Sequence, residues 1–194
     1  MRFGILGATQ AWGDDGVEVP LGGPARRALL ALLLFRRGEV VSVDRLTDEI
    51  DPTGGLSPHA LQSQVSRLPT VLGTAAPIER TGAGYRIVVP ADDVDAGRFE
   101  RLAREGHEAL RDGDATSAVV LLREALELWR GPALADVADR EAAQAAAARL
   151  DEQRLAALED RIEGELLGER PAPSWPSCAS SSNAIRCGNG SPGC

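Results

Sequence analysis

The segment 57–73, SPHALQSQVSRLPTVLG, combines a regular apolar spacing with a polar face that carries no carboxylate. Apolar residues recur at the spacing i, i+4, i+7, i+11, which places them on one face of a helix, namely Leu61, Val65, Leu68 and Leu72. The remaining faces carry short polar groups and one guanidinium, namely His59, Gln62, Ser63, Ser66, Arg67 and Thr70. Such side chains can hydrogen-bond DNA base edges without charge repulsion. A solvated amphipathic helix is the alternative interpretation of this segment taken alone.

Composition places the chain among globular proteins. Its 194 residues, 43% of them hydrophobic and 26% charged, suffice for one large or two modest domains. No apolar run approaches the roughly 18 residues of a membrane span, and the N-terminus lacks the layout of a signal peptide, so we expect a cytoplasmic protein that contacts no membrane. The three cysteines, Cys178, Cys187 and Cys194, have neither CxxC spacing nor a nearby histidine, which predicts neither a disulfide framework nor a metal site.

The acidic residues of the chain are concentrated in its middle part. Residues 1–90 contain nine Arg and nine Asp or Glu, residues 91–170 contain eleven and twenty, and residues 171–194 contain one Arg, so that net charges of 0, −9 and +1 give the overall −8. The neutral first half is compatible with a DNA-binding module, whereas the acidic middle indicates a surface for protein partners or simple solubility. All 21 basic residues are Arg, which indicates a GC-rich coding bias.

The first ninety residues predict a small sheet, three helices and a hairpin. We expect antiparallel strands at 2–6 and 17–21 around the turn cluster 13–16. A buried helix should begin at Pro24 and end before Gly38, and a second should begin after Ser42 and end at Ile50. The segment 57–73 supplies the third helix, and strands at 78–80 and 85–89 flank a glycine turn.

The second half predicts helices throughout. Apolar stripes indicate one helix that begins near residue 92 and closes at Gly113, one at 115–130 and a long Ala-rich helix or helix pair at 140–167. Small residues at the crossing of the first two are typical of a tetratricopeptide-like hairpin, which stacks on neighbouring units. The expected inward seam of the long segment is apolar, namely Leu150, Leu155, Leu158, Ile162 and Leu166.

Several motifs now support a resemblance to a known family. The N-terminal sheet with ALQSQVSRL and TGAGYRI resembles the winged DNA-binding domain of response regulators, most closely that of the Streptomyces antibiotic regulatory protein (SARP) family. The passages FERLAREG, LLREALELWRGPALADV and RLAALEDRIE resemble the bacterial transcriptional activator domain that follows it in this family. The resemblance implies an α+β winged helix-turn-helix domain at 1–91 and an all-α tetratricopeptide-like domain, incomplete, at 92–168.

The same resemblance implies a function. It makes 57–72 the recognition helix and 80–85 the wing, with DNA contacts by Gln62, Ser63, Ser66, Arg67 and Thr70 from the helix and by Arg80, Thr81 and Arg86 from the hairpin. The chain would then be a sequence-specific transcriptional activator of a secondary-metabolite, or antibiotic, gene cluster. It would bind direct repeats in double-stranded promoter DNA, self-associate there, recruit RNA polymerase and need no cofactor.

Two departures from the family pattern favour an alternative, a truncated or non-functional helical protein-interaction module without effective DNA binding. Pro69 stands where the family has a basic residue, so the helix should end or kink at Leu68 and phosphate contacts should be missing. An enzyme has little support, because the chain has no Gly-rich phosphate loop and only His59 and His107 as histidine bases.

The segment 169–194 is the second departure, rich in Pro, Ser and Gly and without apolar periodicity, so we expect disorder there. Residues 173–194, written in GC-rich codons and read two bases later, give ELAELRELVERHPLRERLAGL, an amphipathic helical pattern. We therefore interpret the tail as the product of a frameshift near codons 168–173, which the nucleotide sequence would test.

Overall fold

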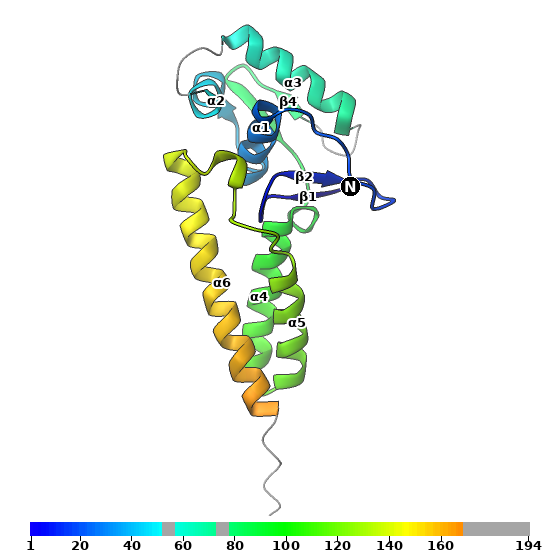
Figure 1. The fold of residues 1–194 in the computed structure, drawn as a ribbon, viewed down its shortest axis with the longest axis vertical. Helices are drawn as coiled ribbons and strands as arrows, with labels where there is room; N and C mark the ends of the chain where they lie inside the picture. The colour runs from blue at the N-terminus through cyan, green and yellow to red at the C-terminus, as the bar shows by residue number, and fades with distance from the viewer. Residues whose placement is uncertain (52–56, 73–77, 169–194) are drawn as a thin grey trace, which may run out of the picture.

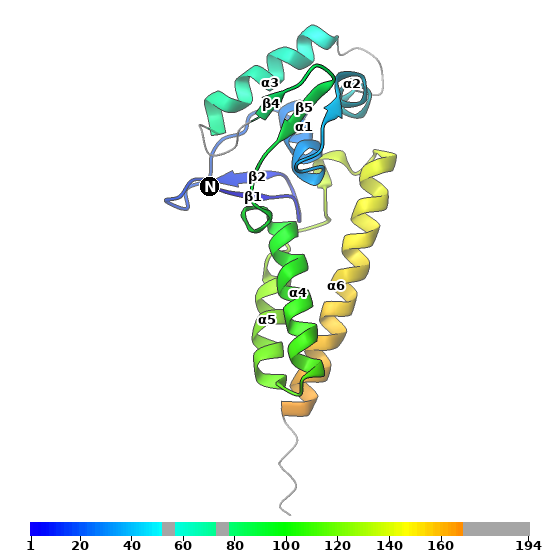
Figure 2. The ribbon, with the colours of Figure 1, turned by 180° about the vertical axis from the view of Figure 1, so that it is seen from behind.

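The computed structural model describes residues 1–51, 57–72 and 78–168, with the backbone alone for residues 58 and 69–72. The molecule is elongated, with α3 at one end and a three-helix unit at the other (Figures 1 and 2). The tail 169–194, and with it the predicted frameshift and disorder, lies outside the described residues.

In its described residues, the winged part contains two small antiparallel sheets and three helices. Its elements are β1 (Arg2–Gly4), β2 (Gln10–Trp12), α1 (Pro24–Phe35), β3 (Val41–Ser42), α2 (Val43–Ile50), α3 (Pro58–Leu72), β4 (Ile78–Arg80) and β5 (Gly84–Ile87). β1 pairs with β2, and β5 lies between β3 and β4 in the second sheet. Because β3 leads directly into α2, the hairpin β4–β5 is tied to the helices through Val41 opposite Tyr85.

The N-terminal hairpin differs from the prediction in its second strand. β1 pairs with β2, whereas residues 17–21, expected as the partner, contribute only one isolated bridge. That prediction is wrong because the chain turns back earlier. The backbone N–H groups of Ile5 and Leu6 donate to the carboxylate of Asp95, so β1 ends at Gly4.

Helix boundaries follow local capping signals. The Ser42 hydroxyl accepts the N–H of Arg45 at 3.2 Å, and the Ser57 hydroxyl accepts the N–H of Ala60 at 3.2 Å, as N-caps should. Of the two effects expected of Pro69, an end or a kink at Leu68, the end is wrong, because α3 continues to Leu72. Proline removes one helical hydrogen bond, but Leu68 is 0% exposed in the core, and such tertiary packing outweighs local propensity.

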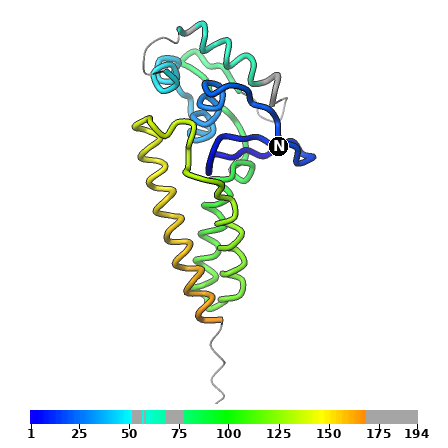
Figure 3. The backbone as a smooth tube through the Cα atoms, in the orientation of Figure 1, coloured from blue at the N-terminus to red at the C-terminus, as the bar shows by residue number. Residues whose placement is uncertain are grey.

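The second half is helical. It contains the 3-10 helix η2 (Ala91–Asp93), α4 (Asp95–Arg111), α5 (Ala115–Glu127), the 3-10 helix η3 (Ala135–Val137) and α6 (Glu141–Gly168). α4 and α5 form an antiparallel hairpin, and α6 packs against both as one continuous helix that runs away from the winged part (Figure 3). None of the helices in the described ranges is long and apolar enough to cross a membrane.

α6 packs through small residues. The predicted leucine-rich seam is wrong at three positions, because Leu155, Ile162 and Leu166 are 61%, 45% and 62% exposed. The buried positions are Ala143, Ala146, Leu150, Ala157 and Gly164. A Cβ at Gly164 would lie only 2.9 Å from Cγ2 of Val119, so the glycine permits the close approach of α6 to α5. The apolar stripe on the opposite face of α6 is left exposed.

One buried hydrophobic cluster joins the two halves, while most of the helical half packs in a cluster of its own. This cluster contains the apolar residues of α1 and four residues of the helical half. These four are Leu134, which precedes η3, Val137 in η3, and Ala143 and Ala146 from α6. α1 itself is apolar almost all round, with every residue from 28 to 34 buried. This helix therefore packs against both the winged sheet and the helical half, and fixes one relative to the other.

Candidate nucleic-acid interface

The packing of α3 decides which of its faces is open. Leu61, Val65 and Leu68 are 0%, 6% and 0% exposed and pack into the core that α1 and α2 also line. The other side of α3 faces away from the molecule (Figure 1). Four of the candidates predicted from the sequence lie on or beside this outward face: Gln62, Ser66 and Arg67 are exposed, and Ser63 is half-buried. The side chain of Thr70, the fifth, lies outside the described residues.

The polar groups of this face are open to a partner. The Ser66 hydroxyl donates to the carbonyl oxygen of Ser63 at 3.0 Å, which leaves its oxygen free to accept a hydrogen bond. Among the described residues, the Gln62 amide and the Arg67 guanidinium have no hydrogen-bond or ion-pair partner. The face therefore offers donors, acceptors and one free positive charge, which suits base edges and phosphates.

The turn of the β4–β5 hairpin is held by backbone bonds. The N–H of Thr81 donates to the carbonyl oxygen of Gly84 at 2.9 Å, and the N–H of Gly84 returns a bond of 3.3 Å. The Thr81 hydroxyl also donates to that Gly84 oxygen at 3.4 Å, so this predicted contact residue stabilises the turn. Arg80 is exposed and has no partner in the described part of the chain. It is the open cation of the wing.

Arg86, the other wing arginine predicted to contact phosphate, is ion-paired. Its guanidinium Nε and Nη2 lie 2.7 and 2.6 Å from Oε2 of Glu79, which stands opposite it in the β4–β5 register. Both side chains are about two-fifths exposed. A phosphate would have to displace Glu79 to engage Arg86, so this residue is a weaker candidate than Arg80.

Sequence reasoning missed two further residues at the edge of α3. Gln64 is half-buried on its flank, and Arg26, in the first turn of α1, donates from Nε to Oε1 of Gln64 at 3.4 Å. The two are 38 positions apart. Helical spacing assigns Gln64 to a flank but gives no sign of its partner from another helix.

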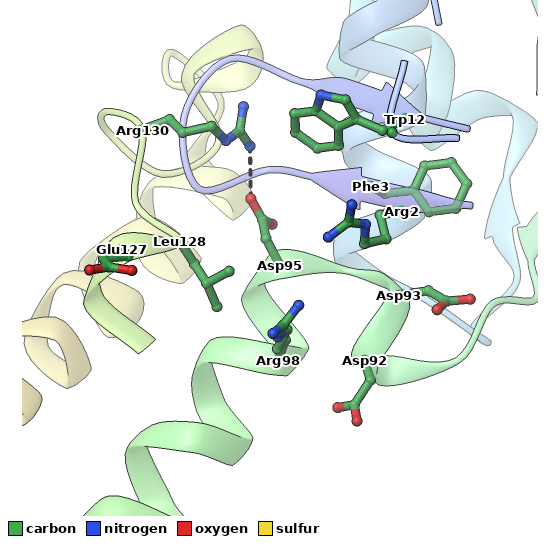
Figure 4. Close-up of a pocket in the computed structure, with 11 residues that line it drawn as sticks. Arg2, Phe3, Trp12, Asp92, Asp93, Asp95, Arg98, Glu127, Leu128 and Arg130 are labelled. Atoms are coloured by element: carbon green, nitrogen blue, oxygen red, sulfur yellow. Dashed lines mark hydrogen bonds and ion pairs between the residues drawn. The ribbon is translucent and has the colours of Figure 1, made fainter. Parts of the chain in front are cut away.

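The face is held in a fixed orientation to the helical half by Asp95 at the start of α4. Its carboxylate accepts the N–H groups of Ile5 and Leu6 at 2.7 and 3.0 Å and lies 2.7 Å from Nη2 of Arg130 (Figure 4). The backbone N–H of Arg130 donates back to the Leu6 carbonyl at 2.8 Å. The Arg130 guanidinium also lies 5.0 Å from the ring centre of Trp12 on β2.

These groups border a cavity of about 280 Å³ between β1–β2 and the start of α4 (Figure 4). Its walls carry both signs of charge, and several of these charges already form ion pairs, such as Asp95 with Arg130 and Asp92 with Arg101. In the described ranges, no group of His, Cys or carboxylate side chains is arranged to hold a metal ion. The cavity therefore belongs to the junction between the halves.

A second tie runs from η3 to α1. The Asp136 carboxylate accepts the N–H of Thr9 at 2.6 Å and the Nε–H of Arg27 at 2.9 Å. Burial alone would raise the pKa of Asp136, but the bonds from Thr9 and Arg27 outweigh it, so the pKa lies below its ordinary value. The first turn of α1 thus reaches α3 through Arg26 and the helical half through Arg27.

Comparisons with known proteins agree with this architecture. A family model described as the bacterial transcriptional activator domain matches residues 94–177. The regulatory protein AfsR of Streptomyces coelicolor is 38% identical over 171 residues, which cover 86% of this chain and 17% of AfsR. The transcriptional regulator RedD of the same organism is 40% identical over 152 residues, 73% of this chain and 43% of RedD. The chain thus spans less than half the length of these two relatives.

Two further matches cover more of the fold. The regulatory protein DnrI of Streptomyces peucetius is 35% identical over 190 residues, 91% of this chain and 69% of DnrI. A solved structure of Mycobacterium tuberculosis EmbR in complex with a low affinity phosphopeptide superposes with a TM-score of 0.77 at 32% identity, over 85% of this chain and 45% of that one. Its likeness extends over the winged helix-turn-helix and the helical unit alike. The chain therefore belongs to the Streptomyces antibiotic regulatory protein family of transcriptional regulators.

Proposed function

We propose that the chain binds promoter DNA sequence-specifically, with α3 in the major groove and the β4–β5 hairpin on the neighbouring backbone. The observation that carries this proposal is the outward face of α3, where Gln62, Ser66 and Arg67 are exposed beside Ser63 and no carboxylate is present. Side chains of this kind read base edges, and the cation of Arg80 on the wing adds affinity for phosphate. In this proposal the DNA-binding domain is 1–91, and the activator domain is 92–168.

The helical domain would act on proteins and not on DNA. Residues 91–170 carry a net charge of −9, which disfavours contact with phosphates, and α6 extends away from α3 (Figure 1). An activator needs a surface directed at the transcription machinery, and this domain supplies one at a fixed angle to the DNA-reading face. RNA polymerase is the partner that this role requires.

The regulated genes follow from the family and not from the site. The relatives AfsR, RedD and DnrI are streptomycete regulators, and membership of their family supports a secondary-metabolite gene cluster as the target. Two or more copies would bind direct repeats at such a promoter. The protein would act in the cytoplasm, by binding energy alone and without a cofactor.

A gel-shift titration of the whole chain on promoter fragments from its neighbouring gene cluster tests the proposal. We expect one fragment to bind preferentially, with the logarithm of the binding constant falling linearly with the logarithm of salt concentration. Arg67→Ala should weaken the shift, whereas Glu163→Gln, an exposed position on the far helix, should not. Equal and weak binding of every fragment by the folded protein would refute the proposal.

The exposed stripe on α6 supports a second role, protein binding by the helical half without DNA. An apolar surface of α6 is exposed to water, formed by Leu155, Ile162 and Leu166. Exposed apolar surface of this kind is typical of protein-binding sites. If this role replaced DNA binding, Leu155→Gln with Leu166→Gln would abolish association with protein, and Arg67→Ala would have no effect on any activity. Loss of promoter binding in Arg67→Ala decides for the first role.

A further inference from the structure

The first turn of α1 holds Arg26 against the flank of α3. Its guanidinium donates from Nη1 to the carbonyl oxygen of Leu21 at 3.1 Å and from Nε to Oε1 of Gln64 at 3.4 Å. Gly22 makes room for this placement, because a Cβ there would lie 2.5 Å from Nη1 of Arg26. The guanidinium is therefore fixed by two acceptors and by the shape of the loop before α1.

This contact determines which way the amide of Gln64 points. A guanidinium has donors only, so the atom of Gln64 that faces Arg26 has to be the carbonyl oxygen. The amide nitrogen then points away from Arg26 with both of its hydrogens. A free glutamine can offer either its oxygen or its nitrogen to a partner, but Gln64 is held with its donor group directed away from Arg26.

The surroundings of Gln64 favour an electron-rich partner. Arg67 lies three residues further along α3, on the same side of the helix, and is exposed without a partner among the described residues. One guanidinium thus contacts Gln64, and a second is carried by the same side of α3. In the major groove, guanine presents two acceptors, N7 and O6, and neither a donor nor a methyl group. Cytosine presents a donor, adenine a donor beside its N7 acceptor, and thymine its O4 acceptor beside a methyl group.

We propose that Arg26 is a positioning residue that presents the Gln64 amide as a hydrogen-bond donor, so that Gln64 selects guanine at one base pair of the binding site. The inference rests on the proposed DNA binding and deepens it. The specificity of α3 then depends on a side chain of α1 that makes no contact with the base. Gln62, which has no such partner in the described part of the chain, carries no comparable restriction.

Binding measurements on the full chain test the selectivity. A bound promoter site is varied to all four base pairs at each position, and affinities are measured for the wild type, Gln64→Ala, Arg26→Met and Arg26→Ala. We expect the wild type to prefer guanine at one position by about tenfold, the order of one direct base contact. Both Gln64→Ala and Arg26→Met should remove most of that preference, because methionine keeps an unbranched side chain but donates no hydrogen bond to Gln64. Arg37→Ala, an exposed arginine at the other end of α1, should retain it.

A measurement without DNA separates this inference from the proposed function. The side-chain amide resonances of Gln64, assigned through their loss in Gln64→Ala, should shift in Arg26→Met and stay in place in Arg37→Ala. Unshifted resonances in Arg26→Met overturn the inference, even if Arg26→Ala fails to fold. A guanine preference that survives in Arg26→Met but not in Gln64→Ala also overturns it, while leaving DNA binding intact. A wild type that binds all fragments alike overturns the proposed function and this inference together.

Discussion

Asp95 and Arg130 form an ion pair of 2.7 Å within the helical half, and the same carboxylate reaches across the junction to accept the N–H groups of Ile5 and Leu6. The Asp95 side chain is only 8% exposed. A buried carboxylate with this many donors is stable only when all of them are in place. Asp95, at the start of α4, is thus one of the residues that fix the orientation of α3 relative to the helical domain.

Replacement of Asp95 should therefore destabilise the whole chain. In Asp95→Ala, two backbone N–H groups and the Arg130 guanidinium lose their acceptor, and we expect a loss of about 3–5 kcal/mol in the free energy of unfolding. Urea denaturation followed by circular dichroism measures it. Glu163→Gln, an exposed carboxylate on α6, is the control and should change the free energy by less than about 0.5 kcal/mol. A loss below 1 kcal/mol in Asp95→Ala would show that the junction is not held in this way.

Two glycines of the wing should differ in their tolerance of alanine. A Cβ at Gly84 would lie 1.9 Å from the carbonyl oxygen of Val41, so β3 and β5 would have to separate. We expect Gly84→Ala to destabilise the protein by at least about 1–3 kcal/mol and to weaken DNA binding by displacing the wing. At Gly82 nothing lies within 4 Å of an added Cβ, and Gly82→Ala should leave both properties nearly unchanged. Thermal melting and the gel shift measure the pair. Equal behaviour of the two variants would contradict the close approach at Gly84.

Local sequence patterns predicted α3 better than they predicted the elements around it. The spacing of Leu61, Val65 and Leu68 identified the buried side of α3, because a helix on a core has few ways to pack. The partner of β1 was missed, because the N–H groups of Ile5 and Leu6 bond to a carboxylate 90 and 89 positions away. No short-range pattern contains that contact.

The predicted inward seam of α6 was wrong for a different reason. Its leucines have helical spacing, which indicates an apolar face but not that this face is the one that packs. Gly164 and Ala157 allow a closer approach to the neighbouring helix than leucine would, so the small residues face inward. Among the candidate site residues, Arg86 shows the same limit, since its pairing with Glu79 follows from strand register.

Acid should weaken the tie between η3 and α1. The pKa of Asp136 is lowered in the folded chain, so its stabilising contribution is complete above the unfolded value of about 3.9 and is lost as pH falls through the folded pKa. We expect Asp136→Asn to be less stable than the wild type at neutral pH, and the difference to shrink as pH falls below about 4. Urea denaturation between pH 3 and pH 7 measures it. A difference that does not change with pH would exclude a contribution from the ionised carboxylate.

A change of charge in the wing should increase the affinity for DNA. Glu79 neutralises Arg86 next to the open cation of Arg80, so Glu79→Gln should free one guanidinium for phosphate without altering the hairpin. We expect tighter binding of all promoter fragments alike and a salt slope steeper by about one, whereas Arg80→Ala should make the slope shallower by about one. Gel shifts between 50 and 200 mM salt, on specific and scrambled fragments, measure both. If neither Glu79→Gln nor Arg80→Ala changes the salt slope, the β4–β5 hairpin does not contact the DNA backbone. In that case α3 alone contacts the DNA.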